Sequence, residues 1–265
     1  MVVFEKVKKK KLQELGFTEE KVKTIHEELR LKDNDAALIL YNSGKLLLQG
    51  KKSSVEKTAE KLKKAGIGRI SEQEYFRKET GWVIGSDETL KGDTFGGLVV
   101  AAVKADANLR KKLIELGAAD SKLLADKEII IIAEKIKRIV PCEIRSLLPE
   151  EYNKDGSITE MLNRLHLESA KYLAPGKHVV DKYPGCNVGD VQEEKAESKY
   201  VEVAAASMLA RAAALKQLDH LSIEAGFKIP KGSTHVTWAL KELKERKLPL
   251  KKFVKVNFKN VREFL

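Results

Sequence analysis

Segments of strand type and of helix type alternate along the chain from Trp82 onward, and this order limits the possible fold more than any other feature. Residues 82–88 and 96–105 are apolar and strand-like, and further strands are predicted at 142–148 and 177–185. Helices are predicted at residues 125–140, 157–174, 200–226 and 233–247, the third of them starting extended before its alanine-rich part. With hairpin strands ahead of it, this alternation predicts an α/β fold in which helices flank a mixed sheet.

The first third of the chain predicts a smaller unit. Residues 18–30 have apolar side chains at helical spacing and predict a helix. Residues 36–51 predict two strands joined by a turn at Asn42-Ser43-Gly44, and residues 53–66 predict a capped helix ending at a glycine. We expect a small α+β domain at residues 1–68, a linker at 69–80 and a larger domain at 81–265.

The overall charge points to a polyanionic partner. The chain of 265 residues has a formal net charge of +11, and nucleic acid is the commonest partner of such a protein. A solvated, lysine-rich surface is the alternative. No stretch approaches the roughly 20 apolar residues of a membrane span, and the basic N-terminus lacks the apolar core of a signal peptide. We therefore expect a cytoplasmic protein without a membrane partner. The two cysteines, Cys142 and Cys186, lack metal-ligand spacing, which predicts reduced thiols.

Four acidic residues lie where they could take part in chemistry, three of them at the ends of predicted strands and one before a predicted helix. Asp87 and Glu88 end the first strand of the larger unit, Asp181 ends the strand that contains His178, and Glu197 precedes the alanine-rich helix. In α/β folds, active sites and ligand-binding sites are commonly formed at the ends of strands. Carboxylates clustered there repel one another unless a cation neutralises them. Mg²⁺ suits such a site because it prefers oxygen ligands, and two such ions about 4 Å apart can promote phosphodiester hydrolysis.

Each of these acids also has a structural explanation. Neighbouring strand residues point to opposite faces, so Asp87 and Glu88 would be one buried and one exposed side chain. Asp181 would form a surface pair with the adjacent Lys182, and Glu197 would belong to a solvated charged loop.

Three separated segments resemble the signature segments of the type 2 and type 3 bacterial ribonucleases H. They read GSDETLKGDTFGGLVVAAV from Gly85, AADSKLL from Ala118 and KAESKYVEVAAASMLARAAAL from Lys195. The hairpin ILYNSGKLLLQGK from Ile39 resembles the TATA-binding-protein-like domain that type 3 enzymes, the ribonuclease HIII family, carry at the front. A glutamate at position 197, where type 2 enzymes have an aspartate, also resembles type 3.

The resemblance implies a ribonuclease H-like mixed sheet flanked by helices, preceded by a small α+β TATA-binding-protein-like domain. It implies endonucleolytic hydrolysis of the RNA strand of RNA/DNA hybrids with Mg²⁺ or Mn²⁺, by a two-metal mechanism that leaves 5′-phosphate and 3′-hydroxyl ends. The catalytic and metal-binding residues would be Asp87, Glu88, Asp181 and Glu197. The expected form is a monomer without a small-molecule cofactor. The alternatives are a type 2-like enzyme that incises at single ribonucleotides in DNA, and a catalytically inactive hybrid-binding protein.

Two sets of residues are expected to contact the hybrid. In the larger domain they are Lys91, Gly92, Asp93, Ser121, Lys122, Ser207, Lys231 and Ser233. In the front domain they are Tyr41, Asn42, Ser43, Lys45, Gln49 and Lys51. The loop Lys91-Gly92-Asp93 would recognise the 2′-hydroxyl that distinguishes RNA from DNA. For several of these residues a structural role is the alternative: an ion pair for Lys122, helix packing for the alanine run around Ser207, and internal packing for Tyr41.

The loop after the acidic pair departs from the family pattern. The family has a glycine where this chain has Leu90, ahead of Lys91 and Gly92. A leucine adopts a positive φ only at an energetic cost, so the backbone at this position is expected to meet the substrate differently.

Overall fold

The computed structural model describes the chain except for residues 1, 6, 68, 71–76, 119–123 and 155. The chain divides into two compact units, Met1–Gln73 and Glu74–Leu265. Each unit has its own hydrophobic core, so each is described by itself. Within the described residues, no helix is both long enough and apolar enough to span a membrane.

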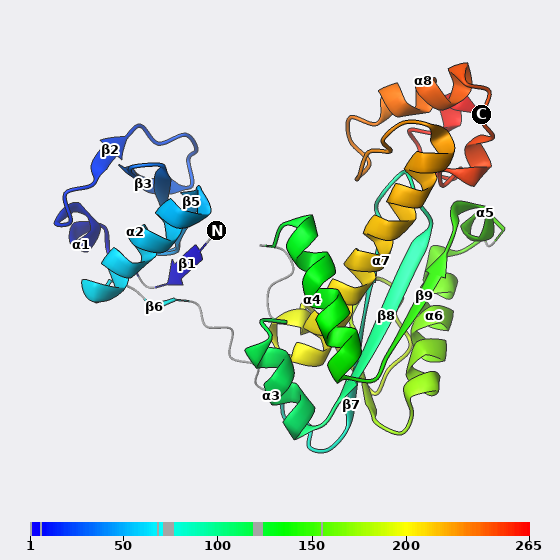
Figure 1. Cartoon of the computed structure of the whole chain (residues 1–265), viewed down its shortest axis with the longest axis horizontal. Helices are drawn as coiled ribbons and strands as arrows, with labels where there is room; N and C mark the ends of the chain where they lie inside the picture. The colour runs from blue at the N-terminus through cyan, green and yellow to red at the C-terminus, as the bar shows by residue number, and fades with distance from the viewer. Residues whose placement is uncertain (1, 6, 68, 71–76, 119–123, 155) are drawn as a thin grey trace. The chain divides into compact units, whose positions relative to one another are not determined.

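The smaller unit is an antiparallel sheet packed against two helices (Figure 1). The strand order is β2 (Thr18–Glu20), β3 (Glu27–Asp33), β4 (Ala36–Tyr41), β5 (Leu46–Gly50), β1 (Val2–Glu5) and β6 (Arg69–Ile70). The helices are α1 (Lys9–Gln13) and α2 (Lys52–Lys64). Alternate residues of the central strands, Leu38, Leu40, Leu46 and Leu48, are fully buried in the core that also includes Leu62 of α2. The predicted hairpin at residues 36–51 and the helix that follows it are therefore present.

The prediction of a helix at residues 18–30 is wrong. The chain forms the strands β2 and β3 there, which pair antiparallel with each other, and β3 pairs with β4. Two of the apolar residues that suggested helical spacing are exposed, Val22 at 45% and Ile25 at 88%. Leu29 and Leu31 pack in the core, whereas Arg30 between them forms ion pairs with Glu20 and Glu27, so the side chains alternate as in a strand. Pairing with the hairpin overrides the local helical pattern.

The larger unit is built on a mixed five-stranded sheet, which confirms the predicted fold class. Its order is β11 (Val191–Glu193), β10 (Lys177–Asp181), β7 (Val83–Thr89), β8 (Leu98–Ala105) and β9 (Cys142–Leu147). β7 and β9 pair antiparallel with β8, whereas β10 is parallel to both β7 and β11. β7 is therefore the central strand, with the acidic pair Asp87 and Glu88 near its end.

Helices cover both faces of this sheet (Figure 1). The long helix α7 (Val201–Ala225) crosses one face, with α3 (Ala107–Glu115) and α4 (Asp126–Ile139) beside it, and α6 (Ile158–Leu173) lies on the other. β8 shows the strand period directly: Val99 and Ala101 belong to the core on the α7 side, and Leu98 and Val100 to the core on the α6 side. The remaining elements are α5 (Pro149–Tyr152), α8 (Thr237–Glu245) and the short 3₁₀ helices η2 (Ala196–Ser198), η3 (Leu250–Lys252) and η4 (Arg262–Phe264).

Two details of the larger unit differ from the sequence expectation. Helix α7 begins at Val201, directly after an extended Tyr200, so the segment does not start as a strand. Helix α3 was not predicted, although Asp106 caps it by accepting hydrogen bonds from the backbone amides of Asn108 and Leu109.

Gly85 explains how closely α7 approaches the sheet, because a Cβ atom at this position would overlap the backbone of Glu202 and Val203. A glycine in β7 thus lets α7 lie directly against the strand that carries Asp87.

Candidate active site

Two of the predicted acids lie side by side at the ends of parallel strands. Val180 of β10 pairs with Ser86 of β7, and the next residue on each strand is an aspartate, Asp181 and Asp87. Residues in register on neighbouring strands point to the same face, so both carboxylates lie on the α7 side of the sheet. The Ser207 hydroxyl of α7 hydrogen-bonds Asp87, and the backbone amide of Ala196 donates to Asp181 Oδ1 at 2.9 Å.

The environment of Asp87 disfavours its negative charge. The residue is 8% exposed, and burial together with the neighbouring carboxylates of Glu88 and Asp181 raises its pKa to about 8. Hydrogen bonds from Ser207 and from the backbone amide of Glu88, at 2.8 Å, oppose this rise. Protonating the Asp87 carboxylate, or placing a cation beside it, would stabilise this end of the sheet.

Glu88 points to the opposite face, as the strand period requires. Its carboxylate accepts a hydrogen bond from Lys91 Nζ at 2.7 Å, and His166 Nε2 of α6 lies 3.5 Å from its Oε2. Burial alone would raise the pKa of Glu88, but the close contact with His166 and the hydrogen bond from Lys91 outweigh it and lower the pKa. Lys91 also lies over the ring of Tyr183, with its Nζ 5.4 Å from the ring centroid.

Glu197 lies in η2, next to a residue that contacts Asp181. The residue follows Ala196, whose backbone amide holds Asp181, so η2 brings Glu197 toward the end of β10. Within the described residues, however, no three His, Cys, Asp or Glu side chains surround a common point closely enough to hold a metal ion. The donors are all carboxylate oxygens, and neighbouring carboxylates raise the pKa of Asp87, so their chemistry fits a divalent ion that prefers oxygen ligands, such as Mg²⁺ or Mn²⁺.

A buried network beneath Glu88 was not found from the sequence. The Ser86 hydroxyl lies 2.7 Å from His166 Nδ1 and 2.8 Å from His178 Nε2, so it links α6 to β10. Burial lowers the pKa of His178 to about 4, which keeps this ring neutral at physiological pH. Through His166 the network reaches Glu88 and restricts how its carboxylate can turn.

The loop after β7 contains the predicted substrate-reading residues. Leu90 has a φ of 66°, so it adopts the left-handed conformation that favours glycine, and its side chain is 5% exposed within the core. A Cβ atom at Gly92 would meet open space. The Asp93 carboxylate accepts a hydrogen bond from the backbone amide of Gly232 at 2.8 Å, which ties this loop to the Lys231–Ser233 segment.

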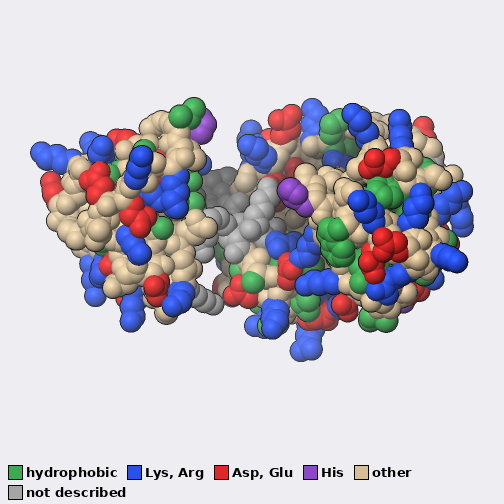
Figure 2. Space-filling model, turned by 90° about the horizontal axis from the view of Figure 1, so that it is seen from above, with side chains coloured by type: hydrophobic (Ala, Val, Ile, Leu, Met, Phe, Trp, Pro, Cys, Tyr) green, Lys and Arg blue, Asp and Glu red, His purple; other side chains and the backbone are tan. Residues whose placement is uncertain are grey.

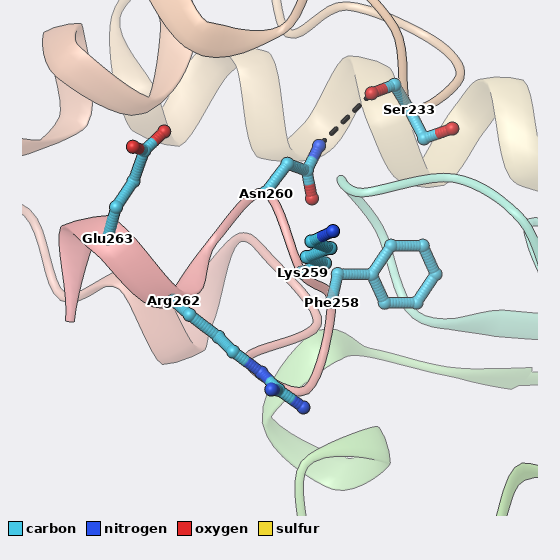
Figure 3. Close-up of a pocket in the computed structure, with 6 residues that line it drawn as sticks. All are labelled: Ser233, Phe258, Lys259, Asn260, Arg262 and Glu263. Atoms are coloured by element: carbon cyan, nitrogen blue, oxygen red, sulfur yellow. Dashed lines mark hydrogen bonds between the residues drawn. The ribbon is translucent and has the colours of Figure 1, made fainter.

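The other predicted contact residues of the larger unit are spread around this loop. Ser207 binds Asp87 and so belongs to the acidic group itself. Lys231 forms an ion pair with Asp126. Ser121 and Lys122 lie outside the described residues. Ser233 lines a pocket of about 630 Å³ formed mainly by the C-terminal segment (Figure 3).

In that pocket, Asn260 connects two loops. Its Nδ2 donates to the backbone oxygen of Ser233 at 3.0 Å, the dashed line in Figure 3, and to Thr94 Oγ1 at 2.8 Å. The cationic residues Lys259 and Arg262 also line the pocket and are exposed. The pocket therefore adjoins Thr94, at the end of the loop after β7, and its charged lining residues are Lys259, Arg262 and Glu263.

The predicted contact residues of the smaller unit lie around the β4–β5 hairpin. Asn42 Nδ2 donates to the backbone oxygen of Ile25 at 3.2 Å, and Lys51 pairs with Asp35 at 3.1 Å. Tyr41 is half-buried, and Ser43, Gln49 and Lys51 are exposed. Figure 2 shows Lys and Arg side chains across the visible face of each unit, with acidic side chains among them.

Comparisons with known proteins agree along nearly the whole chain. The family described as Ribonuclease HII matches residues 84–261. Ribonuclease HIII of Bacillus pumilus is 33% identical over 257 residues, which cover 84% of this chain and 84% of that protein. Ribonuclease HIII of Bacillus velezensis is 34% identical over 258 residues, covering 84% of this chain and 82% of that protein.

Two crystal structures match nearly the whole length of the chain. One, described as Bst-RNase HIII in complex with Mn²⁺, has a TM-score of 0.64 at 27% identity and covers 99% of this chain and 97% of its own. The other, RNase H3 of Aquifex aeolicus, has a TM-score of 0.58 at 28% identity and covers 96% and 99% of the two chains.

Proposed function

The chain belongs to the ribonuclease HII/HIII family of ribonuclease H enzymes, and we propose that it hydrolyses the RNA strand of RNA/DNA hybrids internally with the help of Mg²⁺ or Mn²⁺. The products would carry 5′-phosphate and 3′-hydroxyl ends. The observation that carries this proposal is the pair of aspartates, Asp87 and Asp181, on one face of the sheet, with Glu88 at the same strand end on the other face.

The acidic residues would hold the cation. Asp87 and Asp181 lie on the α7 side, Glu197 follows in η2, and Glu88 comes from the other face at the same strand end. When bound, a divalent cation supplies charge neutralisation at the phosphodiester and lowers the pKa of a water molecule. No side chain is then needed as the nucleophile.

Other residues of the chain orient these carboxylates. The Ser207 hydroxyl fixes Asp87, and the Ala196 amide fixes one oxygen of Asp181. Lys91 and His166 hold Glu88 from two sides. Because the Lys91 side chain is 38% exposed, its ammonium can turn from Glu88 to a substrate phosphate.

Recognition of RNA would use the backbone of the same loop. Gly92 has open space where a side chain would be, so a sugar can approach the main chain closely. A 2′-hydroxyl can both donate and accept a hydrogen bond, which a backbone amide or carbonyl can meet. Asp93 contributes indirectly, since its carboxylate is occupied by the amide of Gly232.

The proposal is tested with an end-labelled RNA/DNA hybrid and three proteins: wild type, Asp87→Asn and Asp219→Asn. Asp219 is an exposed aspartate of α7 and serves as the matched control. Loss of a group that merely orients a metal ligand costs 10–100-fold, so Asp87→Asn is expected to lower the cleavage rate about a hundredfold or more while hybrid binding persists. Asp219→Asn should cleave like wild type.

Further conditions separate the competing functions. Cleavage should require Mg²⁺ or Mn²⁺ and stop in EDTA. A DNA duplex with one embedded ribonucleotide, used in parallel, distinguishes this activity from a type 2-like incision. Tight hybrid binding by the wild type with no cleavage under any metal would make the chain a binding protein and refute the proposal.

A further inference from the structure

The C-terminal segment pairs with the chain just after the substrate-reading loop. The backbone amide of Lys255 donates to the oxygen of Thr94 at 3.0 Å, and the amide of Gly96 donates to the oxygen of Phe253 at 3.0 Å. Between them, Phe95 and Val254 form an antiparallel bridge. This short pairing brings the Lys255 side chain under the loop.

The side chain of Lys255 is buried in an unusual environment for a lysine. The residue is 0% exposed, and its Nζ donates to the backbone oxygen of Asp93 at 2.6 Å. The ammonium lies 5.4 Å from the ring centroid of Tyr152 and 5.3 Å from that of Phe258. Burial lowers its pKa to about 7, although the Asp93 carboxylate opposes this effect. Burying an ammonium opposes folding, whereas an apolar side chain of similar length would favour it.

The same loop is held at two further points. The Asp93 carboxylate accepts from the amide of Gly232 at 2.8 Å, and Thr94 Oγ1 accepts from Asn260 at 2.8 Å. Lys255 adds the hydrogen bond to the Asp93 carbonyl, two residues after Lys91. The acidic residues Asp87 and Glu88, in contrast, are fixed by the sheet and by α7 and α6.

We propose that Lys255 is a positioning residue, whose buried ammonium fixes the Leu90–Thr94 loop in the conformation that presents Lys91 and Gly92 to the substrate. That the loop binds substrate rests on the proposed function. That Lys255 holds the loop in place does not depend on it. Lys255 acts through the Asp93 carbonyl and touches no reacting atom. Its loss should therefore affect substrate binding more than the chemical step.

The test compares Lys255→Met, Lys255→Arg and Lys252→Met with the wild type. Methionine fills a similar volume without the charge, and arginine keeps a charged donor. Lys252 lies on the same segment and pairs with Glu224 at 3.2 Å, away from the loop, so its replacement is the matched control. For each protein we would measure the melting temperature, amide hydrogen exchange in residues 91–94, and KM and kcat on the hybrid.

Lys255→Met should melt at or above the wild-type temperature while its loop amides exchange faster. Its KM should rise about tenfold, the size that the loss of one charge-assisted hydrogen bond gives, with kcat changed less than about twofold. Lys255→Arg should recover part of the loop protection and of KM. Lys252→Met should behave like wild type in all three measurements.

Two results would overturn the inference. In one, Lys255→Met and Lys255→Arg both lower the melting temperature and exchange rises evenly along the larger unit, which means a general structural role. In the other, Lys255→Met is stable and the loop exchanges as in the wild type. Because exchange and melting need no activity, a wild type that fails to cleave hybrids would refute the proposed function and leave this test intact.

Discussion

At the scale of single residues, Leu90 combines two opposing effects. Its φ of 66° costs a leucine roughly 1–2 kcal/mol relative to an ordinary backbone conformation. Its side chain is 5% exposed, and burying a leucine contributes about 1.5–3 kcal/mol. Burial therefore offsets the backbone strain, which explains how this chain can have a leucine at a position with a positive φ.

This balance predicts an unusual order of stabilities. Leu90→Ala and Leu90→Gly should both destabilise the protein, but the glycine variant should be the more stable of the two by about 1 kcal/mol, because glycine adopts the positive φ without strain. Urea unfolding followed by tryptophan fluorescence measures this in the larger unit, since both tryptophans, Trp82 and Trp238, lie there. At Leu113, buried within helix α3, the order should be reversed, with alanine the more stable. The same order at both positions would contradict the interpretation.

The buried ammonium of Lys255 predicts a specific pH dependence of stability. Its pKa is about 7 in the folded protein and near the ordinary 10.5 in the unfolded chain. Between these values the unfolded chain binds a proton that the folded protein does not, so the unfolding free energy contributed by this group rises with pH. Lys255→Met lacks this contribution. Its stability advantage over the wild type at pH 7 should therefore shrink by on the order of 2–4 kcal/mol by pH 10.

Urea unfolding of both proteins at several pH values checks this prediction. The other titrating groups are common to both proteins, so they cancel in the difference between the two unfolding free energies. A difference that stays constant from pH 7 to pH 10 would mean that the Lys255 ammonium keeps an ordinary pKa.

At the scale of elements, the contact between β7 and α7 sets the position of Asp87. Gly85 allows the backbone of α7 to lie directly on the strand. Asp87 lies two residues after Gly85 on this strand, and its carboxylate accepts a hydrogen bond from Ser207 of α7. Gly85→Ala should destabilise the larger unit by about 1–3 kcal/mol through overpacking, and it should lower kcat because α7 and Ser207 move away. Gly92→Ala is the control, since its new methyl group meets open space and should leave stability unchanged.

Thermal unfolding and steady-state kinetics on the hybrid distinguish the two glycines. Gly85→Ala should lower both the melting temperature and kcat, whereas Gly92→Ala should change only KM. Equal stability of Gly85→Ala and the wild type would show that α7 can retreat from the strand without cost.

Elements were predictable from the sequence where local pattern and tertiary packing agree. Apolar runs and helical spacing indicated most strands and helices of the larger unit, and strand ends directed attention to Asp87, Glu88 and Asp181. Residues 18–30 have a helical pattern that sheet pairing overrides, so the helix expected there is absent. The contacts of Ser86 with His166 and His178 span 80 and 92 residues, and no local pattern indicates them. Lys255 escaped notice for the same reason, because only the folded chain places it under the loop.

At the scale of the whole molecule, the distribution of charge and the division into two units indicate that both units bind the hybrid but only one carries out the reaction. The net charge of +11 is distributed over both units, so each can attract the phosphate backbone. The acidic group lies entirely within the larger unit, and the smaller unit has its own core built around Leu38, Leu48 and Leu62. The smaller unit should therefore add affinity for the hybrid without taking part in the reaction.

Removal of residues 1–73 tests this separation of tasks. The larger unit retains its sheet, both helical layers and all four predicted acids, so the truncated protein should fold with unchanged tryptophan fluorescence. We expect kcat on the hybrid to stay within about threefold of the full-length value and KM to rise about tenfold or more, because linked binding surfaces raise the effective concentration of substrate at the site. The plot of log affinity against log salt concentration should also become less steep, since fewer phosphates are contacted. A truncated protein that folds and binds the hybrid normally but no longer cleaves it would instead assign the smaller unit a part in catalysis.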